Sequence, residues 1–219
     1  ILGSAVNPHV VTETFASGSC AVAEGLIPAG TRKIIRFDTQ TVNQGNADLF
    51  FGNPASNPLF VYAPCHAHYH FQNYMSYRLR DANGQIAATG LKVGFCVLDV
   101  FRWSGSSPPN ALYTCVNQGI QQGWGDLYDS TLDGQWIDIT GLPDGNYTME
   151  MEANPLGIIL ESDYGNNITT IPITIGNSSA PPANNNFASA QTLLGTSPSV
   201  TGTTTNATKE TNEPNHAGN

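Results

Sequence analysis

The sequence predicts an all-β protein, built as an antiparallel β-sandwich with long loops. Short runs that alternate polar and apolar residues occur along most of the chain, as expected for half-buried strands. Glycine, proline and asparagine separate these runs, and no long segment has the 3.6-residue period of a helix. With 219 residues, 40% of them hydrophobic, the chain is large enough to bury a sizeable core.

The predicted strands follow one another at short intervals. In residues 147–154, Tyr147, Met149 and Met151 fall on one face, and polar residues alternate with them on the other. Asn83-Gly84 is a turn dipeptide between two such runs. The expected strands cover residues 33–43, 74–81, 86–100, 135–140, 147–154 and 168–175.

The composition changes after Ile175, which predicts a domain boundary. Residues 177–186 are rich in serine, proline and asparagine and predict a linker. Residues 187–219 are too few to form a core of their own. Their sequence resembles the start of the pre-peptidase C-terminal β modules of secreted bacterial proteins. We therefore expect one domain over residues 1–176, followed by the linker and the truncated start of another β module or a disordered tail.

The charge balance is acidic and argues against nucleic acid as a partner. The chain has 8 lysines and arginines against 17 aspartates and glutamates, a formal net charge of −9. Nucleic acid is not an expected partner, because no basic stripe is present to neutralise phosphates. An acidic surface favours cationic partners such as amines, metal ions or basic protein segments. No membrane span is expected, since no apolar run reaches the ~18–20 residues that cross a bilayer.

The four cysteines, Cys20, Cys65, Cys96 and Cys115, form no C-x-x-C pair, which argues against a zinc ribbon or a thioredoxin-like motif. An even number suits two disulfides in an oxidising compartment, with buried free thiols as the alternative. The chain begins without the basic and apolar regions of a signal peptide. We therefore expect a mature or excised piece of a secreted protein.

Three histidines occur within five residues, since His66, His68 and His70 alternate with Ala67 and Tyr69. Alternate side chains of a strand share a face, and neutral imidazoles on one face can bind copper or zinc, with copper favoured by affinity. A flat strand would hold the outer two Cα atoms ~13 Å apart, too far to share one ion. The strand must therefore bend if all three bind. The alternatives are a two-ligand site and a surface run without metal.

Longer segments around these histidines carry a specific combination of motifs. They read CHAHYHFQNYMSYRLRDANGQIAATGLKVGFCVLD, CVNQGI and GWGDLYDSTLDGQWIDITGLPDGNYTMEMEANPLGIILESDYGNN, with TVNQGNADLF upstream. Together they resemble the catalytic domain of the lysyl oxidase family over about residues 7–175. That family comprises secreted copper amine oxidases, which use O2 to convert a primary amine, typically a peptidyl lysine, to an aldehyde, releasing ammonia and hydrogen peroxide.

The resemblance assigns the site residue by residue. It implies that His66, His68 and His70 bind copper, and that a lysine tyrosylquinone cofactor forms from Lys92, in GLKVGFC, and Tyr128, in GWGDLYDSTLDG. A lysine buried in so apolar a run would have a lowered pKa and be a competent nucleophile. The alternative for Lys92 is a side chain that faces solvent. Tyr128 is expected in a loop rich in glycine and aspartate.

The catalytic base stays open at this point. The carboxylates nearest to Tyr128 in sequence are Asp126, Asp129 and Asp133, and the sequence does not choose among them. Trp124 and Gly134 stand where the family has a disulfide that flanks the tyrosine. Packing must therefore hold this segment.

The resemblance also suggests disulfide pairs. Cys65 and Cys115 match a pair that the family bridges, which leaves Cys20 to pair with Cys96.

A calcium site is a further implication of the resemblance. The segment ESDYGNN (161–167) corresponds to a calcium-binding segment in some family members, and its oxygen donors suit a hard cation. These donors are Glu161, Asp163, Asn166 and Asn167. The alternative is a polar loop between strands, because this region also resembles immunoglobulin-like bacterial modules. We thus expect an immunoglobulin-like core whose long loops carry the copper and quinone site.

Three functions fit these observations to different degrees. The first is a secreted amine oxidase that depends on copper and a self-made quinone. The second is a non-catalytic secreted metal-binding β module of a surface protein, and the third a purely structural repeat. The presence of both Lys92 and Tyr128 favours the first, because a metal-binding module needs neither. The three histidines favour the second function over the third, because a purely structural repeat needs no metal ligands.

Overall fold

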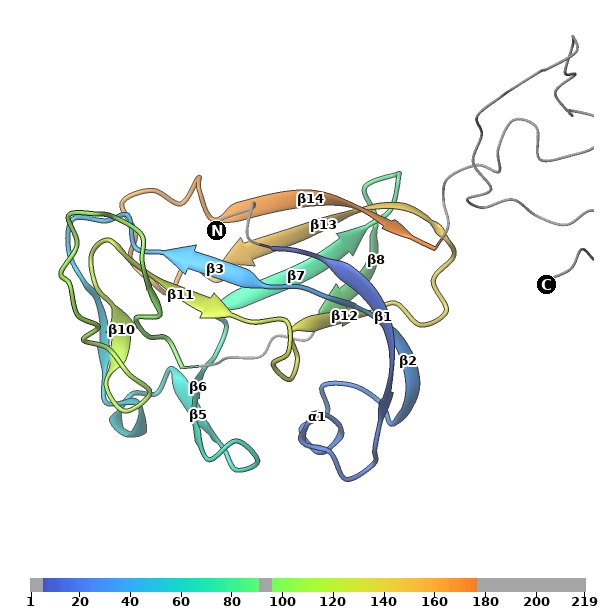
Figure 1. Ribbon diagram of the computed structural model, residues 1–219, viewed down its shortest axis with the longest axis horizontal. Coiled ribbons are helices and arrows are strands. Elements are labelled where there is room, and N and C mark those ends of the chain that lie inside the picture. Colours follow the sequence, from blue (N-terminus) through green and yellow to red (C-terminus); the bar gives the residue numbers. More distant parts are fainter. Residues whose placement is uncertain (1–5, 91–95, 177–219) are drawn as a thin grey trace, which may run out of the picture.

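A computed structural model describes residues 6–90 and 96–176 of the chain. Figure 1 shows that strands dominate this part, which confirms the predicted all-β class. The helical segments are the single-turn α1 (Cys20–Ala23) and the 3-10 turn η2 (Pro54–Ser56). The strands are β1 (His9–Phe15), β2 (Gly30–Arg36), β3 (Thr39–Val42), β4 (Leu49–Gly52), β5 (Phe60–Ala63), β6 (His68–Phe71), β7 (Met75–Arg80), β8 (Ile86–Gly90), β9 (Phe101–Arg102), β10 (Gln118–Ile120), β11 (Trp124–Tyr128), β12 (Trp136–Asp138), β13 (Gly145–Ala153) and β14 (Ile168–Ile175).

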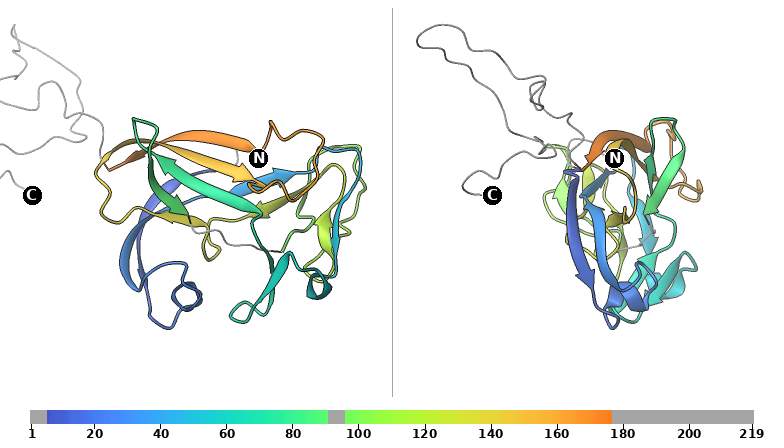
Figure 2. Two further views of the ribbon diagram at one scale, coloured as in Figure 1. Left: turned by 180° about the vertical axis from the view of Figure 1, so that it is seen from behind. Right: turned by 90° about the vertical axis from the view of Figure 1, so that its right-hand side faces the viewer.

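The strands form antiparallel sheets around a shared core. The largest sheet has the order β14-β13-β7-β8, and its inner face packs against the sheets β1-β2-β12 and β3-β11-β9 (Figure 1). Two small sheets, β10-β4 and β5-β6, extend from this body. Figure 2 shows that α1 and the β5–β6 hairpin project from the same side of the molecule. This sheet-on-sheet packing is the sandwich that the sequence predicts.

Strand β13 shows how the sequence pattern becomes the core. Met149 and Met151 are fully buried and Tyr147 nearly so, as the period-two alternation predicts. They pack in the main core with side chains from the facing sheets, among them Ile35 and Ile137. Burial of this apolar face is the main force that holds the sheets together.

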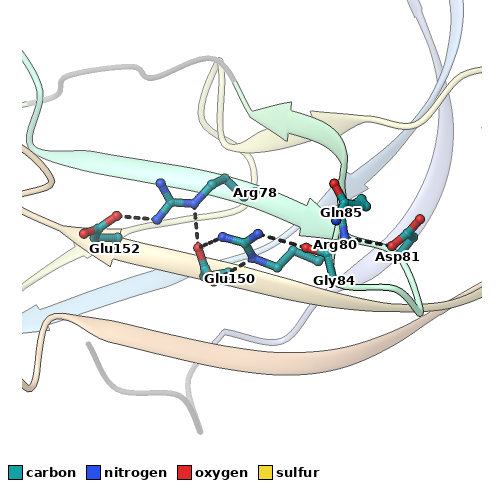
Figure 3. A network of polar contacts seen from close by, with 7 residues as sticks. All are labelled: Arg78, Arg80, Asp81, Gly84, Gln85, Glu150 and Glu152. Atoms are coloured by element: carbon teal, nitrogen blue, oxygen red, sulfur yellow. Dashed lines mark hydrogen bonds and ion pairs between the residues drawn. The ribbon is translucent and has the colours of Figure 1, made fainter.

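The outer face of the same sheet carries an ion-pair network across β7 and β13 (Figure 3). Arg78 Nε donates to Glu150 Oε1 at 2.6 Å, and the same guanidinium also contacts Glu152. Arg80 Nε donates to the other oxygen of Glu150 at 2.8 Å. The hydrogen bond from Arg80, helped by Arg78, holds the pKa of Glu150 below its ordinary value. The network joins β7 to its neighbour β13 on this face of the sheet.

Three predicted segments differ from the structure. The run 33–43 is divided at Phe37-Asp38 into β2 and β3. The run 86–100 is strand only to Gly90: residues 91–95 lie outside the described residues, and residues 96–100 form no strand. Tyr128 is the last residue of β11 and not a loop residue.

The segment after Cys96 is not a strand, because the N–H groups of Val97 and Leu98 donate to the side chains of Gln118 and Asp126. Asp99, in the same segment, is buried. Its carboxylate accepts hydrogen bonds from the backbone N–H groups of Leu112, Tyr113 and Gln121 and from the Gln121 side chain. One side chain thus organises backbone groups that a sheet ladder would otherwise pair.

The disulfide pairs differ from those inferred by resemblance, which were wrong. Cys20 pairs with Cys65, with their Cα atoms 5.7 Å apart, because α1 packs beside the loop of the β5–β6 hairpin. Cys96 pairs with Cys115, at 5.0 Å, next to Gln118, whose side chain donates to the carbonyl of Cys115. All four cysteines are oxidised, as the even count predicts.

Strand β14 forms one edge of the large sheet, where it pairs with β13. It contains Pro172, opposite Thr148, and its residues alternate in exposure along the strand. Among the residues that the structure describes, no helix has the length and apolar character needed to cross a bilayer.

The ion-pair network predicts a specific acid response. Because the folded-state pKa of Glu150 is below its ordinary value of 4.5, its contribution to stability is present above that value and is lost as the pH falls through the folded pKa. We expect Glu150→Gln to lower the Tm by about 2–4 °C at neutral pH. The Tm of the variant should then fall less steeply than that of the wild type between about pH 5 and pH 3. Thermal unfolding by circular dichroism checks this, and parallel curves for the two proteins would contradict it.

Candidate active site

The β5–β6 hairpin brings the histidines together through a tight turn. Its strands pair Ala63 with His68, so residues 64–67 form the loop. The carbonyl of Ala63 accepts hydrogen bonds from the N–H groups of His66 and Ala67, at 3.1 and 2.9 Å. Ala67 has a φ of 57°, in the left-handed region. The bend that three shared ligands require is therefore present, and it lies between the first and second histidine.

The result of this turn is a three-histidine cluster. One ring nitrogen each from His66, His68 and His70 lies within 4.8 Å of the others. The Nε2 atoms of His68 and His70 are 3.0 Å apart. His66 and His68 are half-buried, and His70 is buried. Three imidazoles that converge in this way fit a copper or zinc ion and leave a further coordination position open.

The surroundings keep these imidazoles in the form that binds metal. Burial lowers the pKa of His70 to about 4, with further lowering from His68 and His66. Burial likewise lowers the pKa of His68. A metal ligand must be unprotonated, and these two rings are neutral at neutral pH without any need for the ion to displace a proton.

Two carboxylates approach the first histidine from other parts of the chain. Nε2 of His66 lies 3.6 Å from Oδ2 of Asp133 and 3.9 Å from Oε2 of Glu24. Sequence reasoning considered Asp133 only as a base and missed Glu24 entirely. The missing signal was the Cys20–Cys65 pairing, which brings the end of α1 to the hairpin.

Tyr128 is a core residue at the end of β11. It is 3% exposed, and its ring meets that of Tyr74 nearly perpendicularly at 5.9 Å. Burial raises the pKa of Tyr128 well above its ordinary value, and the charge of Asp126 adds to this effect. The phenol is therefore held in its protonated form.

Of the candidate bases, Asp126 and Asp129 differ sharply in burial and in pKa. Asp126 is 1% exposed and accepts from the N–H of Leu127 at 2.9 Å. Burial raises its pKa to about 8, and backbone hydrogen bonds and Tyr128 oppose part of the rise. Asp129 is exposed, and a hydrogen bond from Thr131 lowers its pKa. Asp126 is thus the carboxyl that interacts with the tyrosine.

Packing takes the place of the disulfide that flanks the tyrosine elsewhere in the family that the sequence resembles. Trp124 is buried, and its Nε1 donates to the carbonyl of Pro108 at 3.0 Å. Gly134, at the other position, has a φ of 79°, which glycine adopts without strain. The expected cofactor residue Lys92 lies outside the described residues.

The acidic loop before β14 brings some of its oxygen donors together. Glu161 Oε1 accepts from the side-chain amides of Asn154 and Asn167, at 2.5 and 2.8 Å. Asn167 is buried, whereas Asp163 is exposed and accepts from the backbone N–H of Gly165. Of the four expected ligands, the structure thus joins Glu161 and Asn167, while Asp163 and Asn166 are exposed.

Comparison with known proteins agrees with this geometry. A sequence model of the family described as lysyl oxidase matches residues 10–183, most of the chain. The chain belongs to the lysyl oxidase family. The resemblance seen in the motifs is thereby confirmed, and the three-histidine hairpin lies within the matched region.

Similar lysyl oxidase homologs are known from several vertebrates. The chain is 40% identical over 144 residues to lysyl oxidase homolog 3B of Danio rerio, covering 64% of this chain and 17% of that protein. It is 35% identical over 162 residues to lysyl oxidase homolog 2 of Homo sapiens, covering 68% of this chain and 20% of that protein. The chain therefore spans about a fifth of the length of these relatives.

The left-handed residue of the hairpin yields a test of the site's construction. Because a non-glycine residue in this region is strained by about 1 kcal/mol, we expect Ala67→Gly to stabilise the protein by up to about that amount and to keep metal binding. Ala67→Val should destabilise it and weaken copper binding, since a β-branched residue resists this conformation. Urea denaturation and a copper titration check both.

A matched control separates this effect from a general response to glycine. Ala88→Gly, at a position of β8 that lies beside a register shift and packs against the core, should destabilise the protein by about 0.5–1 kcal/mol or more. If the change at Ala67 destabilised the protein as much as the change at Ala88, the left-handed turn would not be the constraint described above.

Proposed function

We propose that this chain is a copper-dependent amine oxidase that oxidises primary amines, in peptidyl lysine or small molecules. One amine, O2 and water give an aldehyde, ammonia and hydrogen peroxide. Copper and a lysine tyrosylquinone, when bound, would supply the two-electron chemistry of this reaction. The observation that carries the proposal is the convergence of three histidines in a member of the lysyl oxidase family.

The donor set fits copper. His66, His68 and His70 would hold the ion through neutral nitrogen ligands, which suit copper and zinc. The lowered pKa values of His68 and His70 keep these nitrogens unprotonated. A three-ligand site also suits catalysis, because a further position stays open.

Tyr128 and Lys92 are the proposed precursors of the quinone. Asp133, five positions after Tyr128, approaches His66, so the segment that follows β11 reaches the histidine cluster. Asp126 is the proposed proton acceptor, because it interacts with Tyr128 and its pKa of about 8 is close to neutral pH. Its burial keeps that carboxyl away from bulk water.

The proposed location is extracellular. Two disulfides form in the described part of the chain, and disulfides persist in oxidising compartments. The net charge of −9 suits protonated amines as substrates, since an acidic surface attracts cations.

The quinone assignment can be tested directly. Copper-loaded, aerated protein should show a Lys92–Tyr128 cross-linked peptide by mass spectrometry, a chromophore that reacts with phenylhydrazine, and peroxide release with a primary amine. Lys92→Arg and Tyr128→Phe should each abolish all three while copper binding remains, because each variant lacks one precursor but keeps the three histidines.

Two variants serve as matched controls. Lys33→Arg keeps the charge that faces Asp144, and Tyr62→Phe changes an exposed tyrosine of the hairpin. Both should retain the cross-link and the peroxide release. A protein that binds copper but leaves Lys92 and Tyr128 unmodified would contradict the oxidase and favour a metal-binding β module without catalysis.

We also propose that calcium binds the loop 161–167 through Glu161, Asp163, Asn166 and Asn167. The support is the gathering of Glu161 and Asn167, together with oxygen donors that suit a hard cation.

Calcium should therefore raise the Tm in a saturable manner, because a ligand of the folded state stabilises it. Glu161→Gln should remove most of this rise, and magnesium should not replace calcium. A Tm that calcium leaves unchanged in the wild type, after treatment with a chelator, would contradict the site.

A further inference from the structure

His66 has two carboxylates beside its ring. Asp133 and Glu24 approach its Nε2 atom at 3.6 and 3.9 Å, and they come from two separate elements. Glu24 is the C-terminal cap of α1, and Asp133 lies between β11 and β12. The side chains of His66, Glu24 and Asp133 are 13%, 21% and 38% exposed, so the contact is only partly open to water.

One oxygen of this group has no partner. Oε1 of Glu24 is buried and accepts no hydrogen bond within the described ranges 6–90 and 96–176. A buried carboxylate oxygen without a donor is costly, and such atoms in native proteins usually face a ligand, an ion or an ordered water. Glu24 is nevertheless well anchored, because its N–H donates to the carbonyl of Cys20 and the next N–H, of Gly25, donates to that of Val22.

Covalent geometry keeps the three groups near one another. Cys20 begins α1, and its partner Cys65 directly precedes His66. The sulfur of Cys20 also lies within 4.8 Å of His66 and Asp133, but a disulfide sulfur cannot act as a thiolate ligand. Two carboxylates and one imidazole therefore remain as the chemically active groups.

Carboxylates beside a metal-binding histidine have a known physical effect. They accept the proton of the ring nitrogen that does not bind the ion, directly or through a water, which fixes the ring and makes it a stronger ligand. The distances from His66 Nε2 to the two carboxylates exceed a direct hydrogen bond by a few tenths of an ångström. They suit a bridging water or a small movement of the side chains toward one another.

We propose that Asp133 and Glu24 are positioning residues that hold His66 through its Nε2 atom, so that Nδ1 is the nitrogen offered to copper. The inference rests on the proposed function, since it requires that the three histidines bind copper. Because Asp133 follows Tyr128 on the same segment, this contact would also tie the metal centre to the strand that carries the tyrosine.

The test measures copper affinity and not activity. Metal-free protein is titrated with Cu²⁺ against a chromogenic chelator, for the wild type, Asp133→Asn, Glu24→Gln and the double variant. Each single change should weaken copper binding about tenfold, and the double change more, in the range of outer-shell effects. The electron paramagnetic resonance spectrum of bound Cu²⁺ should change as well, because the His66 ring loses its fixed orientation.

Asp129→Asn is the matched control, because it removes a carboxylate of the same segment that binds only Thr131 in the contacts described. It should leave affinity and spectrum unchanged. In a His66→Ala background, the changes at Asp133 and Glu24 should have no further effect on affinity. An equal loss in that background would show that the carboxylates act without His66 and would overturn the proposal.

The possible failures are distinguishable. If the wild type does not bind copper, the proposed function fails. If the wild type binds copper and the carboxylate variants bind it equally well with unchanged spectra, only the positioning role fails. Thermal unfolding monitors the fold, and Asp133→Asn alone decides if Glu24→Gln does not fold, since Asp133 is more exposed, at 38% of its side chain.

Discussion

Three imidazoles that alternate along a chain can reach one ion only if the backbone between them leaves the extended conformation. This requirement governs the side of the molecule that carries the β5–β6 hairpin. The turn at Ala67 folds His66 back over β6, and the carbonyl of Ala63 holds that turn with two hydrogen bonds. The disulfide from Cys65 then brings α1 to the same place. The turn and the disulfide thus bring the proposed metal ligands, Glu24 and α1 to one place.

The tyrosine is held by a different principle. Tyr128 ends a strand that pairs with β3, and its ring packs within an aromatic and aliphatic core. Such packing fixes a side chain without a covalent link, which explains how the segment can do without the flanking disulfide of its family. The two halves of the proposed centre therefore differ in construction: a covalently anchored hairpin holds the three histidines, and a sheet holds Tyr128.

The sequence predicted those features that depend on local chemistry. The alternation in residues 147–154 gave the buried face of β13, and the spacing of His66, His68 and His70 required a bend that the structure contains. Features that depend on contacts between residues distant in sequence were either not predicted or predicted wrongly. The disulfide pairs depend on where α1 packs, and the backbone after Cys96 is paired by the side chains of Gln118 and Asp126, at sequence separations of 21 and 28 residues. Glu24 shows the same limit, since only the folded chain reveals that it adjoins His66.

The exposed edge of the large sheet has a consequence for association between molecules. An edge strand offers unpaired backbone groups on which another chain can add a strand. In β14 the residue opposite Thr148 is Pro172, which has no N–H to donate. A second copy that aligned with β14 would meet an interrupted ladder, so growth of a sheet from one molecule to the next is disfavoured. A single proline thus helps to keep the domain separate at high local concentration.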